Sequence, residues 1–131
     1  MKEAAQSAQL PILVVEDEPS VMSFVRAALE RKGYRVVPAQ SGVEALELLK
    51  LYEYLGVISD MRTPGDVDGA DVHAWISANR PHLVKKIMFI TGDIVNQDTA
   101  ATLRRTGAPV VEKPFRVRDF LGVVETIFGK P

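Results

Sequence analysis

Five side chains that could handle a cation and a phosphoryl group stand at or directly after the ends of short apolar runs. Glu16 and Asp17 follow one run, Asp60 ends a second, and Thr91 and Lys113 close two more. Carboxylates gathered in one place repel one another and raise one another's pKa unless a cation neutralises them. Mg²⁺ is the natural candidate, because it prefers oxygen ligands and commonly binds one or two carboxylates together with phosphate oxygens.

The same residue types could carry out phosphoryl transfer. A carboxylate beside Mg²⁺ can act as the nucleophile toward a phosphoryl group, which would make Asp60 an aspartyl phosphate. The charge on the transferred group then needs a cation and a hydrogen-bond donor, and Lys113 and Thr91 are suited to these roles. A hydroxyl that moves to bond a phosphoryl oxygen would also shift the helix and loops that follow it.

The apolar runs alternate with segments of helical periodicity. Strands are expected at 12–15, 34–38, 56–60, 87–91 and 110–111. Helices are expected from 19 to a stop at 33, from a capping-box spacing at 41–44, at about 70–79, at about 97–106, and over a last segment whose apolar residues include Phe120 and Ile127. Five βα units follow from this order.

Such alternation predicts a doubly wound α/β fold with a parallel sheet, because parallel neighbours need crossover connections that are almost always right-handed. In these sheets, ligands bind beyond the carboxyl ends of the strands, where the strand order switches. The five candidate side chains stand at those ends, so we expect them to converge on one site.

The motifs resemble those of receiver domains in two-component response regulators and hybrid histidine kinases. They are Glu16-Asp17 after the first strand, Asp60 with Pro64 and Asp68-Gly69 after it, Thr91-Gly92, and Lys113-Pro114-Phe115. Each is weak alone, but together and in this order they are very specific. The resemblance covers Leu10 to Phe128.

A receiver domain implies a flavodoxin-like (βα)5 fold with strand order 2-1-3-4-5 and phosphoryl transfer from a phosphohistidine onto Asp60. By resemblance, Asp17 and Asp60 would bind Mg²⁺ directly, Glu16 would act mostly through water, and the backbone carbonyl of Arg62 would complete the protein ligands. The Lys113–Pro114 peptide bond is expected to be cis, a state accessible mainly before proline.

The sequence departs from the family pattern at three places. Glu16 stands where Asp is commonest, and the loop at 61–68 is one residue longer than usual. Val110 occupies a position that is usually Tyr or Phe, so aromatic switching there is not expected. Arg62 and Asp93 each fall two residues past a site residue, and we hypothesise that they pair across the mouth and slow hydrolysis of the phosphoaspartate.

The stretch from Thr91 to Phe115 resembles most closely the C-terminal receivers of hybrid histidine kinases. The resemblance therefore implies a transmitter domain, in the same polypeptide or in its dimer partner, as the phosphoryl donor, and a histidine phosphotransfer protein as a receiver downstream. A single-domain regulator and a homodimer both stay open. Such a module catalyses its own phosphotransfer and slow dephosphorylation and is not an enzyme in the usual sense.

Composition and charge restrict the classes of protein to which the chain can belong. The chain has 131 residues with 16 basic and 17 acidic side chains, so no basic field attracts nucleic acid. There are no cysteines, and no apolar run approaches a membrane span or a signal peptide. We expect one cytoplasmic receiver domain at 10–131 after a flexible tail at 1–9, without membrane contact.

Other functions fit less well. An aspartate-nucleophile phosphatase usually has Asp-x-Asp after its first strand, and a dinucleotide-binding domain has Gly-x-Gly-x-x-Gly there; neither pattern is present. A receiver-like module that binds partners without phosphorylation is the remaining alternative. His73 and His82 lack a further ligand at metal spacing and are expected to serve packing or the surface.

Overall fold

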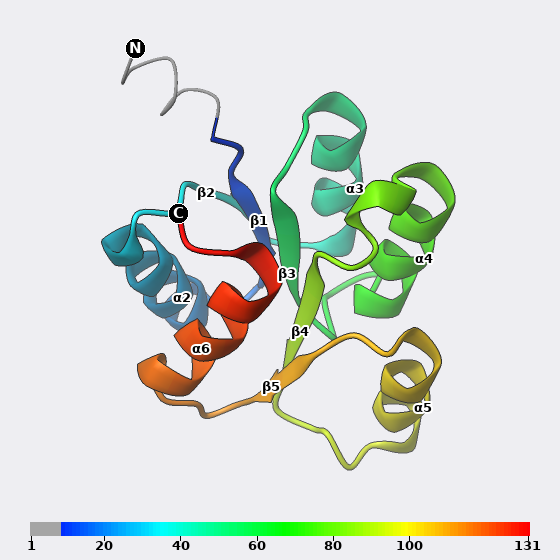
Figure 1. The fold of residues 1–131 in the computed structure, drawn as a ribbon. Coiled ribbons are helices and arrows are strands. Elements are labelled where there is room, and N and C mark those ends of the chain that lie inside the picture. Colours follow the sequence, from blue (N-terminus) through cyan, green and yellow to red (C-terminus); the bar gives the residue numbers. More distant parts are fainter. Residues whose placement is uncertain (1–8) are drawn as a thin grey trace.

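The computed structural model describes residues 9–131 as a five-stranded sheet with helices on both faces (Figure 1). The strands are β1 (Ile12–Val15), β2 (Val36–Ala39), β3 (Gly56–Asp60), β4 (Ile87–Thr91) and β5 (Val110–Glu112). The helices are α2 (Pro19–Lys32), α3 (Gly42–Leu51), α4 (Gly69–Asn79), α5 (Gln97–Thr106) and α6 (Val117–Phe128), with a short 3₁₀ helix, η1 (Pro81–Leu83). Within residues 9–131, no helix combines the length and apolar character that crossing a membrane requires.

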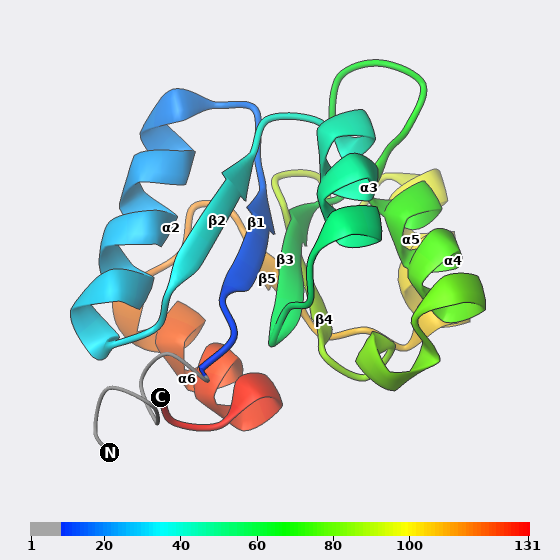
Figure 2. The same ribbon diagram turned by 90° about the horizontal axis from the view of Figure 1, so that it is seen from above.

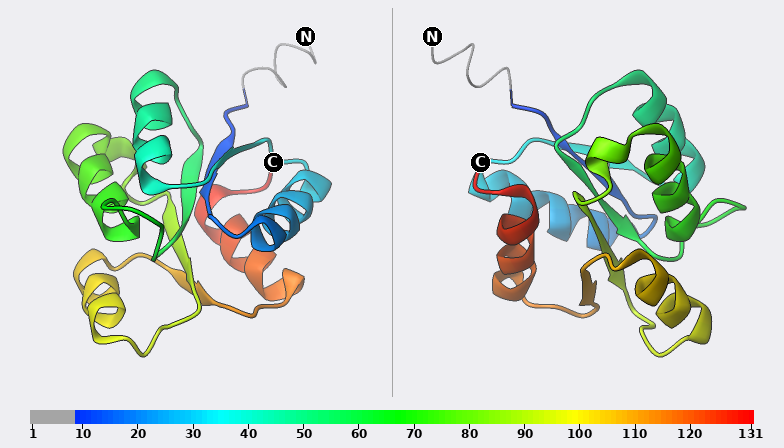
Figure 3. Two further views of the ribbon diagram at one scale, coloured as in Figure 1. Left: turned by 180° about the vertical axis from the view of Figure 1, so that it is seen from behind. Right: turned by 45° about the vertical axis from the view of Figure 1, so that its right-hand side comes forward.

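The sheet has the order β2-β1-β3-β4-β5, and every pairing is parallel. This confirms the predicted doubly wound architecture. Helices α2 and α6 cover one face, and α3, α4 and α5 cover the other (Figures 2 and 3). The predicted tail lies outside the described residues except for Gln9, whose carbonyl accepts a hydrogen bond from the side chain of Arg35.

Alternation along the strands divides the core between the two faces. On β1, Ile12 and Val14 pack into the cluster under α2 and α6, whereas Leu13 and Val15 pack into the cluster under α3 and α4. All four side chains are fully buried. A strand buried on both faces reads as a continuous apolar run, which is why period-two alternation is absent from the sequence of this strand.

Local signals explain where most elements begin and end. The Ser41 hydroxyl accepts a hydrogen bond from the Glu44 N–H at the start of α3, and Asp68 and Asp71 form a reciprocal capping box at the start of α4. Helix α2 ends at Gly33, which has the left-handed φ of 107° that glycine adopts without steric cost.

The second strand differs from its prediction. It runs from Val36 to Ala39, where 34–38 was expected, because the Tyr34 N–H still donates to the Leu29 carbonyl of α2 and residue pairing with β1 begins at Val36. Pro38 lies inside the strand although proline lacks a ladder donor. It is tolerated because β2 is at the edge of the sheet, with β1 as its only partner among residues 9–131.

Two glycines provide a matched test of the packing. A Cβ at Gly56 would lie 2.5 Å from the carbonyl oxygen of Lys86 and would collide with the Phe128 ring, whereas a Cβ at Gly122 in α6 meets nothing within 4 Å. We expect Gly56→Ala to destabilise the fold by more than about 2 kcal/mol, since neither backbone nor ring can retreat from a packed core. Gly122→Ala should stabilise it by about 0.5–1 kcal/mol through helix propensity. Urea denaturation measures both, and equal effects would contradict this account.

His73 is a buried histidine on α4. Its Nδ1 lies 3.5 Å from the Ser77 hydroxyl, and its ring packs 6.1 Å from that of Phe89. Burial lowers the pKa of His73, and the nearby Arg105 guanidinium lowers it further. The predicted packing role is confirmed, and the site residues lie elsewhere.

The lowered pKa has a consequence for stability. The unfolded chain binds a proton on His73 at a higher pH than the folded chain does, so stability is complete above the unfolded pKa and falls as pH drops below it. We expect the urea midpoint to decrease between about pH 7.5 and about pH 5.5, and His73→Gln to remove part of that decrease. Equal slopes in the unsubstituted chain and in His73→Gln would rule the effect out.

Candidate functional site

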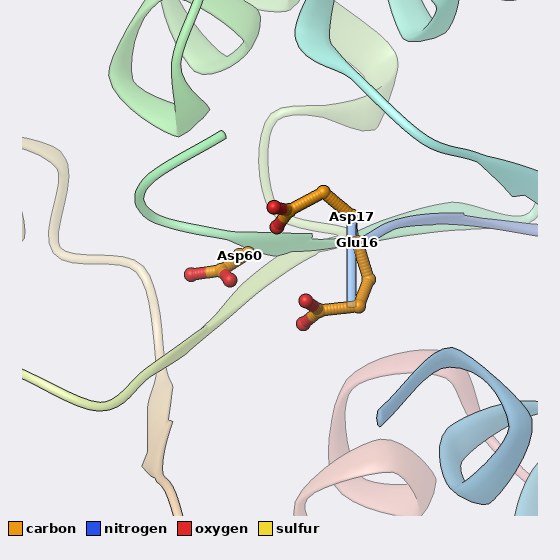
Figure 4. Close-up of side chains that lie close together, drawn as sticks. All are labelled: Glu16, Asp17 and Asp60. Atoms are coloured by element: carbon orange, nitrogen blue, oxygen red, sulfur yellow. The ribbon is translucent and has the colours of Figure 1, made fainter. Parts of the chain in front are cut away.

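Strand register brings the predicted site residues together. Val15 of β1 pairs with Ser59 of β3, so Glu16 and Asp17 emerge beside Asp60. The three side chains gather beyond the ends of β1 and β3 (Figure 4). On the other side, the Lys113 N–H donates to the carbonyl of Thr91 over 2.7 Å, which places the lysine at the same edge of the sheet.

The Lys113 ammonium is the electrostatic centre of this edge. Its Nζ donates to Asp60 Oδ2 over 2.9 Å, and it lies 3.0 Å from Glu16 Oε1 and 3.5 Å from Glu18 Oε1. Asp60 and Glu16 are buried, and the lysine side chain is 16% exposed. The lysine therefore offsets two buried negative charges that would otherwise oppose folding.

Glu16 has one satisfied and one incompletely satisfied oxygen. Its Oε2 accepts the N–H of Glu18 over 3.0 Å. Its Oε1 lies 3.0 Å from Lys113 Nζ as an ion pair, but among residues 9–131 this buried atom accepts no hydrogen bond. Burial raises the pKa of Glu16, and the hydrogen bond from the Glu18 N–H and the nearby Lys113 ammonium only partly offset this rise.

The pKa of Lys113 moves in the direction that keeps it charged. Burial by itself would lower this pKa, but the hydrogen bond to Asp60, the close contact with Glu16 and the charges of both carboxylates raise it by more. The ammonium is thus protonated throughout the physiological range. A fixed positive charge at this position suits a site that receives an anionic group.

The acidic residues fit a divalent cation. Each of Glu16, Asp17 and Asp60 offers a carboxylate oxygen, and these atoms lie within 4.8 Å of one another. The oxygen of Glu16 that lacks a hydrogen bond would gain a partner from a bound ion. Asp60 is oriented from the other side by the N–H of Arg62, which donates to Oδ1 over 3.2 Å. An all-oxygen donor set of this kind matches Mg²⁺.

Thr91 is buried at the end of β4, and its hydroxyl oxygen accepts the N–H of Asp93 over 3.2 Å. The hydroxyl is thus engaged with its own loop. No ion pair joins Arg62 to Asp93 among residues 9–131, so the hypothesised contact across the mouth is not formed in this structure. Val110 is half-buried against the cluster under α3 and α4.

Two hydrogen bonds hold the loop that runs from Asp60 to α4. The N–H of Gly69 donates to the Met61 carbonyl over 3.0 Å, and the Thr63 hydroxyl donates to the Val67 carbonyl over 2.6 Å. A Cβ at position 69 would lie 2.7 Å from the Asp60 carbonyl oxygen, which explains why glycine follows the capping aspartate at 68.

A second feature of the site lies beside Lys113. The Lys113–Pro114 peptide bond is cis, as expected, and the Phe115 ring stacks on the buried Phe120 at 5.2 Å. Phe24 of α2 also packs against Phe115, with 5.7 Å between the ring centroids. The carboxylate of Glu18 also contacts Lys113. The sequence predicts no role for Glu18, and its only signal there is its adjacency to Glu16 and Asp17.

A doubly wound parallel sheet with an acidic cluster and a lysine beyond the carboxyl ends of its strands is the arrangement of a receiver domain. The model of the response regulator receiver domain family matches residues 12–125. The chain therefore belongs to the receiver domain family of two-component signalling.

Similar proteins agree with this assignment. The chain is 33% identical to the response regulator receiver protein CpdR of Brucella abortus over 87% of its own length and 92% of that protein. It is 25% identical to the receiver domain of a sensor histidine kinase of Pseudomonas aeruginosa, a structure described as having a magnesium ion in the active-site cleft, with a TM-score of 0.80 over 93% and 99% of the two chains. A CheY-like receiver protein of Methanospirillum hungatei shares the fold at 23% identity, with a TM-score of 0.80 over 91% and 93%.

Mg²⁺ should stabilise the folded chain through the acidic cluster. Because only the folded chain assembles the cluster, each tenfold excess of Mg²⁺ over its dissociation constant should add about 1.4 kcal/mol. Asp17→Asn should abolish most of this gain, while in the absence of Mg²⁺ it should raise stability by relieving repulsion among the carboxylates. Thermal denaturation with and without Mg²⁺ measures both effects, with Asp66→Asn in the exposed loop as control. Equal Mg²⁺ dependence in both variants would rule out this cation site.

Proposed function

We propose that this receiver domain accepts a phosphoryl group from a phosphohistidine onto Asp60, with Mg²⁺, and changes conformation to regulate a partner or a parent hybrid histidine kinase. The observation that carries the proposal is the 2.9 Å contact between Lys113 Nζ and Asp60 Oδ2 inside a cluster of three carboxylates. A carboxylate held between a cation site and a fixed ammonium can approach an anionic phosphoryl group without prohibitive repulsion.

The side chains take complementary roles in the transfer. A carboxylate oxygen of Asp60 forms the new bond to phosphorus as the P–N bond to the imidazole breaks, and the imidazole leaves with the electron pair. The ammonium of Lys113, already bonded to Asp60 Oδ2, neutralises part of the charge on the transferred group. Asp17, Asp60, Glu16 through water, and the carbonyl of Arg62 would hold Mg²⁺, which neutralises further phosphoryl charge when bound.

Thr91 links the chemistry to conformational change. Its hydroxyl oxygen accepts the N–H of Asp93 at present, and a phosphoryl group on Asp60 offers the hydroxyl proton a strong acceptor. Turning toward the phosphoryl oxygen would release the Asp93 N–H and change the loop that leads into α5. With Val110 in place of an aromatic residue, this loop and α5 themselves would carry the signal.

The partners follow from the same chemistry. The donor would be the transmitter domain of a histidine kinase, in the same polypeptide or a separate one, and a histidine phosphotransfer protein would accept the group downstream, all in the cytoplasm. Similarity to the receiver of a sensor histidine kinase supports an origin in a hybrid kinase. The match to nearly all of CpdR supports a separate regulator. Homodimerisation would add a further route to output.

The phosphoryl acceptor can be identified by intact mass. Incubation with acetyl phosphate and Mg²⁺ should add one base-labile phosphoryl group, because an acyl phosphate is cleaved by hydroxide. The adduct should be lost without Mg²⁺ and in Asp60→Asn, which preserves the shape of the side chain but not its nucleophilic charge. Asp66→Asn, a carboxylate in the neighbouring loop, should be labelled like the unsubstituted chain.

An adduct that persists in Asp60→Asn would place the acceptor on another residue. A folded chain that binds Mg²⁺ but takes up no phosphoryl group from acetyl phosphate, phosphoramidate or a phosphorylated transmitter domain would instead favour a receiver-like module that signals by binding alone.

A further inference from the structure

Glu18 is a third carboxylate on Lys113, and the proposed transfer does not use it. Its Oε1 lies 3.5 Å from Lys113 Nζ, and its side chain is 59% exposed, against 0% for Glu16. Glu18 is also the N-cap residue of α2, yet its side chain makes no capping hydrogen bond to the helix. The carboxylate is therefore not occupied by the helix that it begins, and the ammonium is its ion-pair partner among residues 9–131.

Glu18 lies in the lining of a mostly apolar cavity beside Lys113. Glu18 and Lys113 are the charged residues lining a cavity of about 450 Å³, and the rest of the lining consists of Ser20, Val21, Phe24, Pro114 and Phe115. Because the lining is mostly apolar, few other polar groups weaken the electrostatic repulsion between this carboxylate and an approaching anion. The Glu18 side chain is 59% exposed and that of Lys113 only 16%, so the negative charge is the more accessible of the two to a phosphoryl donor that approaches Asp60 along this side.

We propose that Glu18 selects among phosphoryl donors by their charge. It draws Lys113 Nζ toward the mouth and places a negative charge there, so it slows transfer from free acyl phosphates more than from donors whose leaving nitrogen carries a positive charge. Such nitrogen-linked donors include phosphoramidate and phosphohistidine in their protonated forms. The inference rests on the proposed function and adds a positioning and selectivity residue to it.

Two small phosphoryl donors, acetyl phosphate and phosphoramidate, differ in net charge. With either donor, a carboxylate oxygen of Asp60 bonds to phosphorus. In acetyl phosphate the P–O bond to the acyl group breaks, and acetate leaves with the electron pair. In phosphoramidate, already protonated on nitrogen, the P–N bond breaks and ammonia leaves with the pair. The transferred group is the same, whereas acetyl phosphate arrives with the greater net negative charge.

The experiment compares initial rates of Asp60 phosphorylation with both donors, in Mg²⁺, for the unsubstituted chain, Glu18→Gln, Glu18→Asp and Glu30→Gln. Glu30 is on the same helix, and its exposed carboxylate pairs with Arg26 at 3.1 Å, so Glu30→Gln makes the same change in net charge away from Lys113. Glu18→Asp keeps the charge with a shorter side chain. Circular dichroism and the urea midpoint of each variant establish that all four proteins are folded.

We expect Glu18→Gln to raise the rate with acetyl phosphate about two- to fivefold at low ionic strength, the size of effect that one nearby charge exerts through water. The rise with phosphoramidate should be smaller, so that the ratio of the two rates changes. The change should fade toward 1 M salt, where the screening length falls to about 3 Å. Glu18→Asp should retain most of the original ratio, and Glu30→Gln should retain all of it.

The inference is overturned if Glu18→Gln leaves the ratio of rates unchanged, lowers the acetyl phosphate rate, or matches Glu30→Gln, while the unsubstituted chain is labelled normally. A merely structural role would alter both rates together and would not respond to salt. If the unsubstituted chain takes up a phosphoryl group from neither donor, the proposed function itself fails, and this inference fails with it.

Discussion

The contact of the Lys113 ammonium with Asp60 and Glu16 is the interaction on which the rest of this site depends. Two carboxylates that are buried side by side would raise each other's pKa and resist folding without a cation between them. Lys113 provides that cation permanently, and its own pKa rises as a result. Its positive charge offsets part of the repulsion within the acidic cluster, which favours the approach of an incoming phosphoryl group.

Backbone geometry fixes where these charges meet. The parallel pairing of β1 with β3 sets Glu16 beside Asp60, and the pairing of β4 with β5 brings Lys113 to the same edge. The close approach of α4 at Gly69 supports the strand end that carries Asp60. The site is therefore built on strand ends and short capped loops, which hold side chains more accurately than long loops do.

Helix α5 differs from its neighbours in how it is held. Its buried residues are Thr99 and Thr102, whereas α4 buries Val72 and Ile76 and α6 buries a larger apolar set. A helix with little buried apolar surface can be displaced at low cost in free energy. It follows directly from the loop after Thr91, so the helix that comes after this site hydroxyl in the chain is also the one with the least buried apolar surface. That arrangement suits a chain in which Val110 offers no aromatic ring to transmit a shift.

The sequence by itself determined the five βα units, their doubly wound arrangement and the set of side chains at the strand ends, because periodicity and strand-end position depend on local order along the chain. Tertiary structure decided the rest. Strand β2 begins at Val36 because this residue is the first to pair with β1, opposite Ile12. His73 is buried because α4 packs over Phe89. The contact between Glu18 and Lys113 joins residues 95 positions apart. No local sequence pattern predicts this contact, because the two residues meet only when β1 and β5 end at the same edge of one sheet.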